Sequence, residues 1–103
     1  MHQPATGTIH VVPPEIETYG RTSGEILHAL RQHRGLTLRD VAAATQQIAE
    51  RQKNEEFSIS AGRLSEIENK GAVPNIFRLY SLSVVYQVDL KELLTWFGVP
   101  QTQ

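Results

Sequence analysis

Residues 37–53 read TLRDVAAATQQIAERQK, and the construction of this stretch decides the fold. Thr37 and Asp40 have the spacing of a capping box, in which each side chain accepts a hydrogen bond from the backbone of the other residue. Apolar and small side chains then recur at helical spacing: Leu38, Val41, Ala42, Thr45, Ile48 and Ala49. The pattern predicts a helix of about four turns that ends near Lys53.

Residues 60–69 read SAGRLSEIEN and predict a second, shorter helix. Ser60 is of the type preferred as an N-cap, and Ile59 and Leu64 have the spacing of a hydrophobic staple around it. A glycine and then Pro74 follow shortly after, which favours termination of the helix.

Three further segments carry the same helix signals. They are 22–35, with a capping box of Thr22 and Glu25; 75–86, with Asn75 as cap and apolar positions at Ile76, Leu79, Leu82 and Tyr86; and 89–97, with a capping box of Asp89 and Glu92 and a buried face of Leu90, Leu93, Leu94 and Phe97. We therefore predict an all-α domain of five short helices and no sheet.

The 103 residues are 40% hydrophobic and 20% charged, which fits one small globular domain. Residues 1–20 hold three of the five prolines and no Lys or Arg, so we expect an N-terminal arm that is flexible or partly extended. The helical domain is expected over residues 21–99, followed by a tail over residues 100–103.

The absence of cysteine excludes disulfide bonds and thiolate metal sites. The sequence shows neither a signal-peptide pattern nor an apolar run of eighteen residues, the length that would indicate a membrane span. We therefore expect a cytoplasmic protein.

Residue types needed for catalysis are present but not grouped. His28 and His33 are five positions apart and diverge around a helix, and Glu66 and Glu68 are two apart and face different sides. No glycine loop of the phosphate-binding kind occurs. We expect no enzyme activity, no metal site and no cofactor.

Several short motifs follow one another in an order that is typical of one family. They are Leu30-Arg31, Gly35-Leu36-Thr37, Thr37-Leu38-Arg39-Asp40-Val41-Ala42, Ile67-Glu68, and the closing positions Leu79, Leu82, Val88, Asp89, Leu90, Glu92 and Leu93. In these motifs, residues 22–94 resemble the Xre/Cro-type (lambda-repressor-like) helix-turn-helix family. The resemblance implies a regulator of transcription that binds double-stranded DNA, with the helix over about 60–69 lying in the major groove.

The resemblance also implies which residues touch DNA. Base-facing positions would be Ser60, Ala61, Gly62, Arg63 and Glu66, and backbone-facing positions would be Thr37, Arg39 and Lys70. Arg63 can bind guanine through two hydrogen bonds, and a merely solvated side chain is the alternative. The resemblance further pairs Arg31 with Glu68, which we interpret as an ion pair that fixes the first helix against the third.

The connection between the two quoted stretches is unusually long. Residues 46–58 add about twelve residues to the turn of ~3 to 4 that is usual in this motif, and we expect an extension of the second helix followed by a loop. This insertion favours an alternative function, in which a helix-turn-helix scaffold serves protein–protein interaction through residues 46–58.

The formal net charge is −1, but the charges are unevenly placed. Residues 21–53 carry six basic and three acidic groups, whereas residues 54–70 carry two basic and four acidic groups. An anionic partner is therefore expected to meet the first two helices, through Arg21, Arg34, Arg39, Arg51 and Lys53. The alternative is an ordinary solvated face.

Trp96 lies off the apolar stripe of the last predicted helix. An exposed tryptophan is a common anchor at interfaces, and a homodimer through the helix at 89–97 would place two recognition helices ~34 Å apart, one turn of DNA. The alternative is that Trp96 folds over the first helix of its own chain.

Overall fold

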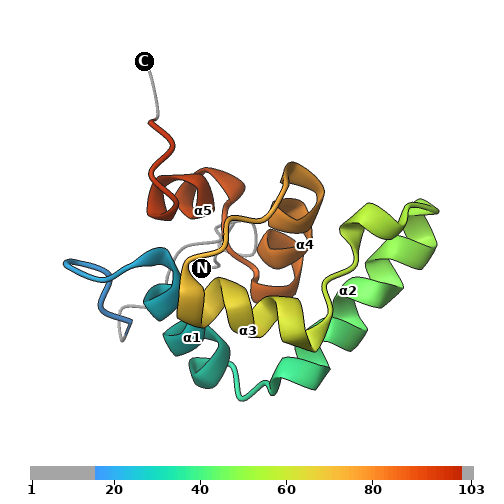
Figure 1. Cartoon of the computed structure of the whole chain (residues 1–103), viewed down its shortest axis with the longest axis horizontal. Helices are drawn as coiled ribbons and strands as arrows, with labels where there is room; N and C mark the ends of the chain where they lie inside the picture. Colours follow the sequence, from blue (N-terminus) through green and yellow to red (C-terminus); the bar gives the residue numbers. More distant parts are fainter. Residues whose placement is uncertain (1–15, 101–103) are drawn as a thin grey trace, which may run out of the picture.

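The computed structural model describes residues 16–100 of the chain. This part contains five α-helices and one short 3-10 helix, joined by turns and short loops (Figure 1). They are α1 (Ser23–His33), α2 (Leu38–Gln52), η2 (Glu55–Phe57), α3 (Ala61–Lys70), α4 (Ile76–Tyr86) and α5 (Leu90–Trp96). This part of the chain contains no strand, so the predicted all-α class and the five helices are confirmed.

All five helices begin directly after the residue that the sequence marks as a cap, and in four of them this residue accepts from the backbone N–H three positions on. The capped backbone N–H groups lie 2.9 to 3.1 Å from the capping oxygens of Thr22, Thr37, Ser60 and Asn75. The capping box predicted for α5 is wrong, because Asp89 Oδ1 accepts from the backbone N–H of Lys91 at 3.0 Å and does not form the reciprocal pair with Glu92. Asp89 still caps the helix.

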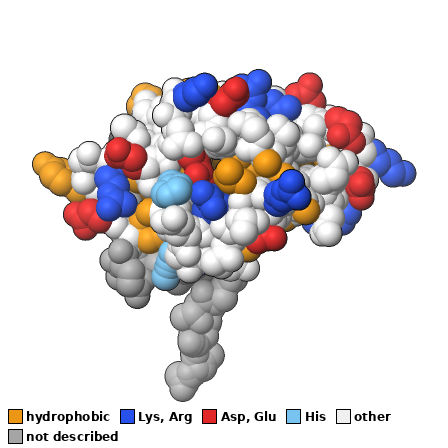
Figure 2. Space-filling view, turned by 60° about the horizontal axis from the view of Figure 1, so that its bottom comes forward, with side chains coloured by type: hydrophobic (Ala, Val, Ile, Leu, Met, Phe, Trp, Pro, Cys, Tyr) orange, Lys and Arg blue, Asp and Glu red, His pale blue; other side chains and the backbone are white. Residues whose placement is uncertain are grey.

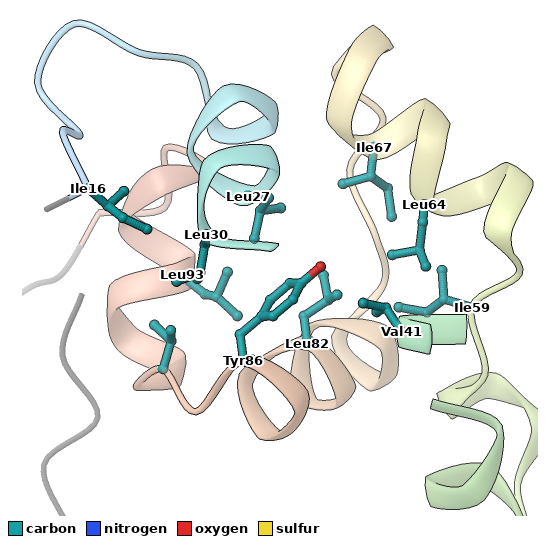
Figure 3. Close-up of a cluster of buried hydrophobic side chains, with 11 residues drawn as sticks. Ile16, Leu27, Leu30, Val41, Ile59, Leu64, Ile67, Leu82, Tyr86 and Leu93 are labelled. Atoms are coloured by element: carbon teal, nitrogen blue, oxygen red, sulfur yellow. The ribbon is translucent and has the colours of Figure 1, made fainter. Parts of the chain in front are cut away.

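The core lies where α1, α3, α4 and α5 converge on Tyr86, whose ring occupies the middle of the cluster (Figure 3). Its members are Ile16, Leu27, Leu30, Val41, Ile59, Leu64, Ile67, Leu82, Tyr86, Val88 and Leu93. Ile16 belongs to the segment predicted as an arm, yet it is buried in this cluster with Leu30 and Leu93. The remainder of the predicted arm, residues 1–15, and residues 101–103 of the tail lie outside the described residues.

The insertion begins as the expected extension of α2, which continues to Gln52. The helix ends at Lys53, whose left-handed backbone (φ 55°) turns the chain back on itself. Thr45 then fixes the returning chain: its fully buried Oγ1 accepts from the N–H of Ile59 at 2.9 Å and donates to the carbonyl of Ala42 at 2.9 Å.

The rest of the insertion is bonded to α4 and is not a free loop. Ser81 Oγ donates to the carbonyl of Phe57 at 2.6 Å, and Arg78 Nε donates to the carbonyl of Ser58 at 2.9 Å. The ring of Phe57 also packs edge-on against Phe77 and Tyr80, with centroids 5.2 and 5.6 Å apart. Residues 46–58 thus form one unit with α2 and α4.

Two expectations about apolar residues need correction. Trp96 is partly buried and, like Phe97, packs against the core, so α5 does not present an exposed aromatic anchor. Ile76, predicted to lie on the buried face of α4, is 54% exposed. It is the first residue of α4, and the core contacts of this helix are made further along by Leu79, Leu82 and Tyr86.

Replacing Thr45 with the isosteric valine tests how the insertion is held. The variant leaves the buried N–H of Ile59 without an acceptor, so we expect the free energy of unfolding to fall by about 1–3 kcal/mol. Urea denaturation followed by circular dichroism measures it. Thr95→Val is the matched control, because Thr95 is exposed and should change stability by less than about 0.5 kcal/mol. Equal effects of the two substitutions would contradict the assigned role of Thr45.

Candidate nucleic-acid interface

The candidate interface is built on α3, which has one buried and one outward face. Leu64, Ile67 and Glu68 point into the protein, and the first two belong to the core cluster. α3 packs against both α1 and α2, which fixes its orientation. Its outward face carries the residues that the family resemblance assigns to DNA.

Glu68 anchors α3 to α1 through a buried ion pair, and the structure brings the two expected partners together. Arg31 Nε donates to Glu68 Oε2 at 2.7 Å and Arg31 Nη2 donates to Glu68 Oε1 at 2.9 Å, while the side chain of Glu68 is only 2% exposed. The third nitrogen, Arg31 Nη1, donates to the carbonyl of Leu36 at 3.0 Å. One guanidinium therefore fixes α3 and the turn into α2 at once.

The ionised form of Glu68 is favoured despite its burial. Burial alone would raise the pKa of this carboxyl, but the hydrogen bonds and positive charge that Arg31 and His28 supply outweigh it and hold the pKa below its usual value. The same pairing raises the pKa of Arg31. The pair therefore stays charged at neutral pH.

His28 is the member of this cluster that the sequence analysis missed. Its Nδ1 lies 2.9 Å from Glu68 Oε1, a hydrogen bond that requires the proton to be on Nδ1. His28 and Arg31 are three residues apart and share a face of α1, so their spacing was the available signal.

A second contact between α1 and α3 depends on a glycine. A Cβ atom at Gly24 would collide with the backbone carbonyl of Glu68 and would lie 2.7 Å from the carbonyl of Ile67. The glycine therefore allows the close approach that the Glu68 ion pair needs.

The N-terminus of α2 carries the predicted phosphate contacts, Thr37 and Arg39, both exposed. Thr37 and Asp40 form the expected capping box, with N–H···O distances of 3.0 and 2.9 Å. Hydrogen bonds from the backbone and side chain of Thr37 lower the pKa of Asp40, so a carboxylate already occupies part of this helix end. The N–H groups of Leu38 and Arg39 precede the first intrahelical bond and point outward.

The outward face of α3 opens with small residues. Ser60 accepts from the N–H of Arg63, Gly62 is exposed, Ala61 is half-buried, and a Cβ atom at Gly62 would meet nothing within 4 Å. Neither packing nor a positive φ explains glycine at this helical position. Ala61 and Gly62 therefore add little side-chain bulk to the start of α3.

Charged side chains follow directly on this face. Arg63 Nη1 donates to Glu66 Oε1 at 3.0 Å, with both side chains about half exposed (49% and 46%), so the pair is weak and can exchange for another partner. Lys70 is exposed at the far end of α3. All eight residues expected to touch DNA thus lie at or near the surface of α2 and α3.

Not every basic residue expected to face an anionic partner is available. Arg34 donates through Nε and Nη2 to the carbonyl of Tyr86, at 3.1 and 2.7 Å, and so caps the C-terminus of α4. Arg34 is therefore less available to an anionic partner than the sequence suggests. Figure 2 brings the lower side of Figure 1 forward and shows Lys and Arg side chains separated by acidic and apolar ones.

Family models, curated proteins and solved structures show no match to this chain. Within residues 16–100, no three His, Asp or Glu side chains are grouped so that they could hold a metal ion. None of the helices that the structure describes is both long and apolar enough to cross a membrane.

Replacing Glu68 with glutamine tests the ion pair. The variant leaves the buried Arg31 without its counter-charge, so we expect a loss of about 3–5 kcal/mol in the free energy of unfolding at pH 7. Because the folded-state pKa of Glu68 is lowered, the stabilisation is complete above the unfolded pKa of ~4.3 and disappears as pH falls through the folded value. The difference between wild type and variant should therefore shrink below about pH 4.

Urea denaturation at pH 7 and at pH 3 measures both effects. Glu66→Gln is the matched control, because it removes a carboxylate from the same helix at a half-exposed position and should cost less than about 0.5 kcal/mol. A Glu68→Gln variant as stable as the control at pH 7 would contradict the anchoring role.

Proposed function

We propose that this domain is a DNA-binding regulator of transcription of the Xre/Cro type. In this proposal α2 and α3 form a lambda-repressor-like helix-turn-helix with an extended first helix, and the first turn of α3 enters the major groove. The protein acts in the cytoplasm on double-stranded DNA, as a homodimer, and no enzymatic step is part of the proposal.

One observation carries the proposal: a firmly anchored helix begins with the small residues Ala61 and Gly62 and presents Arg63, the next residue, to the solvent. The Glu68 ion pair and the buried Leu64 and Ile67 hold α3 in place. The open space around Gly62 would let the backbone of α3 approach base edges closely. Arg63 is then in position to bind guanine O6 and N7.

Contacts to phosphates are supported by α2 and by the far end of α3. The free N–H groups of Leu38 and Arg39 favour an anion, and Arg39 adds a positive charge at the same point. Lys70 supplies a second charge at the far end of α3. Phosphate contacts of this kind set the register of the protein on DNA, whereas Arg63 would read sequence.

The electrostatics favour a modest affinity for each copy of the chain. Arg31 and Arg34 are engaged within the protein, and Arg63 is shared with Glu66. Because these three arginines are wholly or partly engaged, binding should depend strongly on salt and on the joint action of two copies.

Removing the base-reading and phosphate-binding side chains separately tests the proposal. The preferred duplex is first selected from random DNA by the full chain. Arg63→Ala should weaken binding to it by about 1–3 kcal/mol and relax its sequence preference. Arg39→Ala should weaken all duplexes alike and lower the slope of log K against log salt by about 1.

The matched control is Lys91→Ala, which removes an exposed charge from α5, away from α2 and α3. Fluorescence anisotropy over a range of salt concentrations measures all four proteins. A wild-type chain that binds no duplex even at low salt would overturn the proposal, as would equal losses for Arg63→Ala and Lys91→Ala.

A comparison of two glycines tests the close approach of α3 to DNA. Gly62→Ala should leave stability unchanged or raise it by up to about 1 kcal/mol, since alanine is the better helix former, yet DNA affinity should fall because the added methyl meets the groove. Gly24→Ala should instead lose stability, because its Cβ collides with the backbone of α3. A Gly62→Ala variant with wild-type DNA affinity would contradict the approach.

A further inference from the structure

An uncovered apolar surface runs along α4. Among residues 16–100, seven large apolar side chains are exposed, and five of them belong to α4 or to the segment leading into it: Val73, Ile76, Phe77, Tyr80 and Val84, which are 38% to 69% exposed. We call these five the α4 face. Contiguous apolar patches of a few hundred Å² on a soluble protein mark interaction sites.

The α4 face is a second helical stripe on an element that already has one. Ile76, Tyr80 and Val84 recur at intervals of four and so lie in a row, while Leu79 and Leu82 turn to the core. A helix that is apolar on opposite sides is normally covered on both. α2 and α5 cover one side of α4, η2 touches Phe77 and Tyr80 through the ring of Phe57, and the side chains of the α4 face stay 38% to 69% exposed.

The insertion makes this surface rigid. The ring of Phe57 contacts the rings of both Phe77 and Tyr80, and its carbonyl accepts the hydrogen bond of the fully buried Ser81. The aromatic side chains therefore form a ridge that is already ordered. Such a ridge loses little conformational entropy when a partner covers it.

A groove adjoins the ridge at the other end of α4. It has a volume of about 290 Å³, lies between α2 and α4, and is lined by Ala44, Ile48, Val84 and Val85, with Asp40 and Arg51 also on its walls. Val84 belongs both to this groove and to the α4 face. Ridge and groove are therefore parts of one continuous surface.

We propose that the α4 face is a homodimer interface, covered by the same face of a second copy of this chain. Around a two-fold axis two α4 helices run antiparallel, so the Phe77–Tyr80 ridge of each copy meets the Val84–Val85 groove of the other. This pairing replaces the expected dimer through α5, whose aromatic residues are used within the chain.

Charge favours a second copy over other occupants. Arg78 is the only charged residue of α4, and its Nε is turned toward the carbonyl of Ser58, so a two-fold contact places no like charges opposite each other. At the rim, the groove carries both Arg51 and Asp40, and Arg51 is the group that can offer an opposite charge to Glu56 beside the ridge, whose Oε1 also accepts from Asn75 at 2.9 Å. A nucleic acid or an anionic membrane would need basic groups on the α4 face, which has none.

Pairing through the α4 face is compatible with the proposed DNA contacts of α3. The α4 face shares no residue with the outward face of α3, so both α3 helices stay accessible in the dimer. Self-association stands independently of DNA binding and is tested without DNA.

Sedimentation equilibrium of the full chain tests the interface. The wild type should pass from monomer to dimer in the micromolar range, and both Tyr80→Lys and Val84→Glu should shift that transition by at least tenfold in concentration. Val84 makes no ring contact with the insertion, so its variant should keep wild-type circular dichroism. Tyr19→Glu is the matched control, because Tyr19 is 91% exposed away from α4 and its variant should dimerise normally.

Mixing the two variants tests the antiparallel seating. In a mixed dimer the lysine at position 80 of one copy faces the glutamate at position 84 of the other, and the second contact is wild type, so dimers should reform. A wild type that stays monomeric up to about 1 mM, or variants that dimerise like Tyr19→Glu, would overturn the proposal. A mixture that stays monomeric while the wild type dimerises would overturn the antiparallel seating.

Discussion

The bond between Arg31 and a carboxylate that is almost fully buried is the constraint on which the rest of this structure depends. Glu68 is stable there only because three nitrogens, two from Arg31 and one from His28, lie within 2.9 Å of its oxygens. That requirement dictates how closely α1 and α3 approach, and Gly24 removes the side chain that would prevent it. Because Arg31 also holds the carbonyl of Leu36, the position of α2 follows from the same guanidinium.

The insertion at residues 46–58 does not disturb the packing of α1, α2 and α3, because it forms hydrogen bonds of its own to α2 and α4. Thr45 returns the chain to the core at Ile59, and Ser81 and Arg78 bind the backbone of residues 57 and 58. The cost of closing a longer loop grows slowly with its length, and these contacts offset it. The result is an aromatic ridge on α4, remote in sequence from the α3 face.

Helix caps and apolar periodicity made most of the fold predictable from the sequence. The predictions that failed depend on contacts between residues distant in the sequence. Caps such as Thr37 and Ser60 form their hydrogen bonds with residues three positions away, so they can be predicted from the sequence alone. Ile76 satisfies the helical period but is 54% exposed at the start of α4. Arg34, predicted to meet an anionic partner, donates to the carbonyl of Tyr86, fifty-two positions away. Of the candidate site, the residues could be named from the resemblance, but the role of His28 depends on a carboxylate forty positions away.

The most direct test of DNA binding through α2 and α3 is a titration of the isotope-labelled full chain with duplex DNA at low salt. The titration is followed by the chemical shifts of the backbone amides. We predict that the shifts change first at the N-terminal turns of α2 and α3, from Thr37 to Asp40 and from Ser60 to Arg63, with α5 unaffected. Changes confined to η2 and the α4 face, or no changes at any amide, would contradict this prediction.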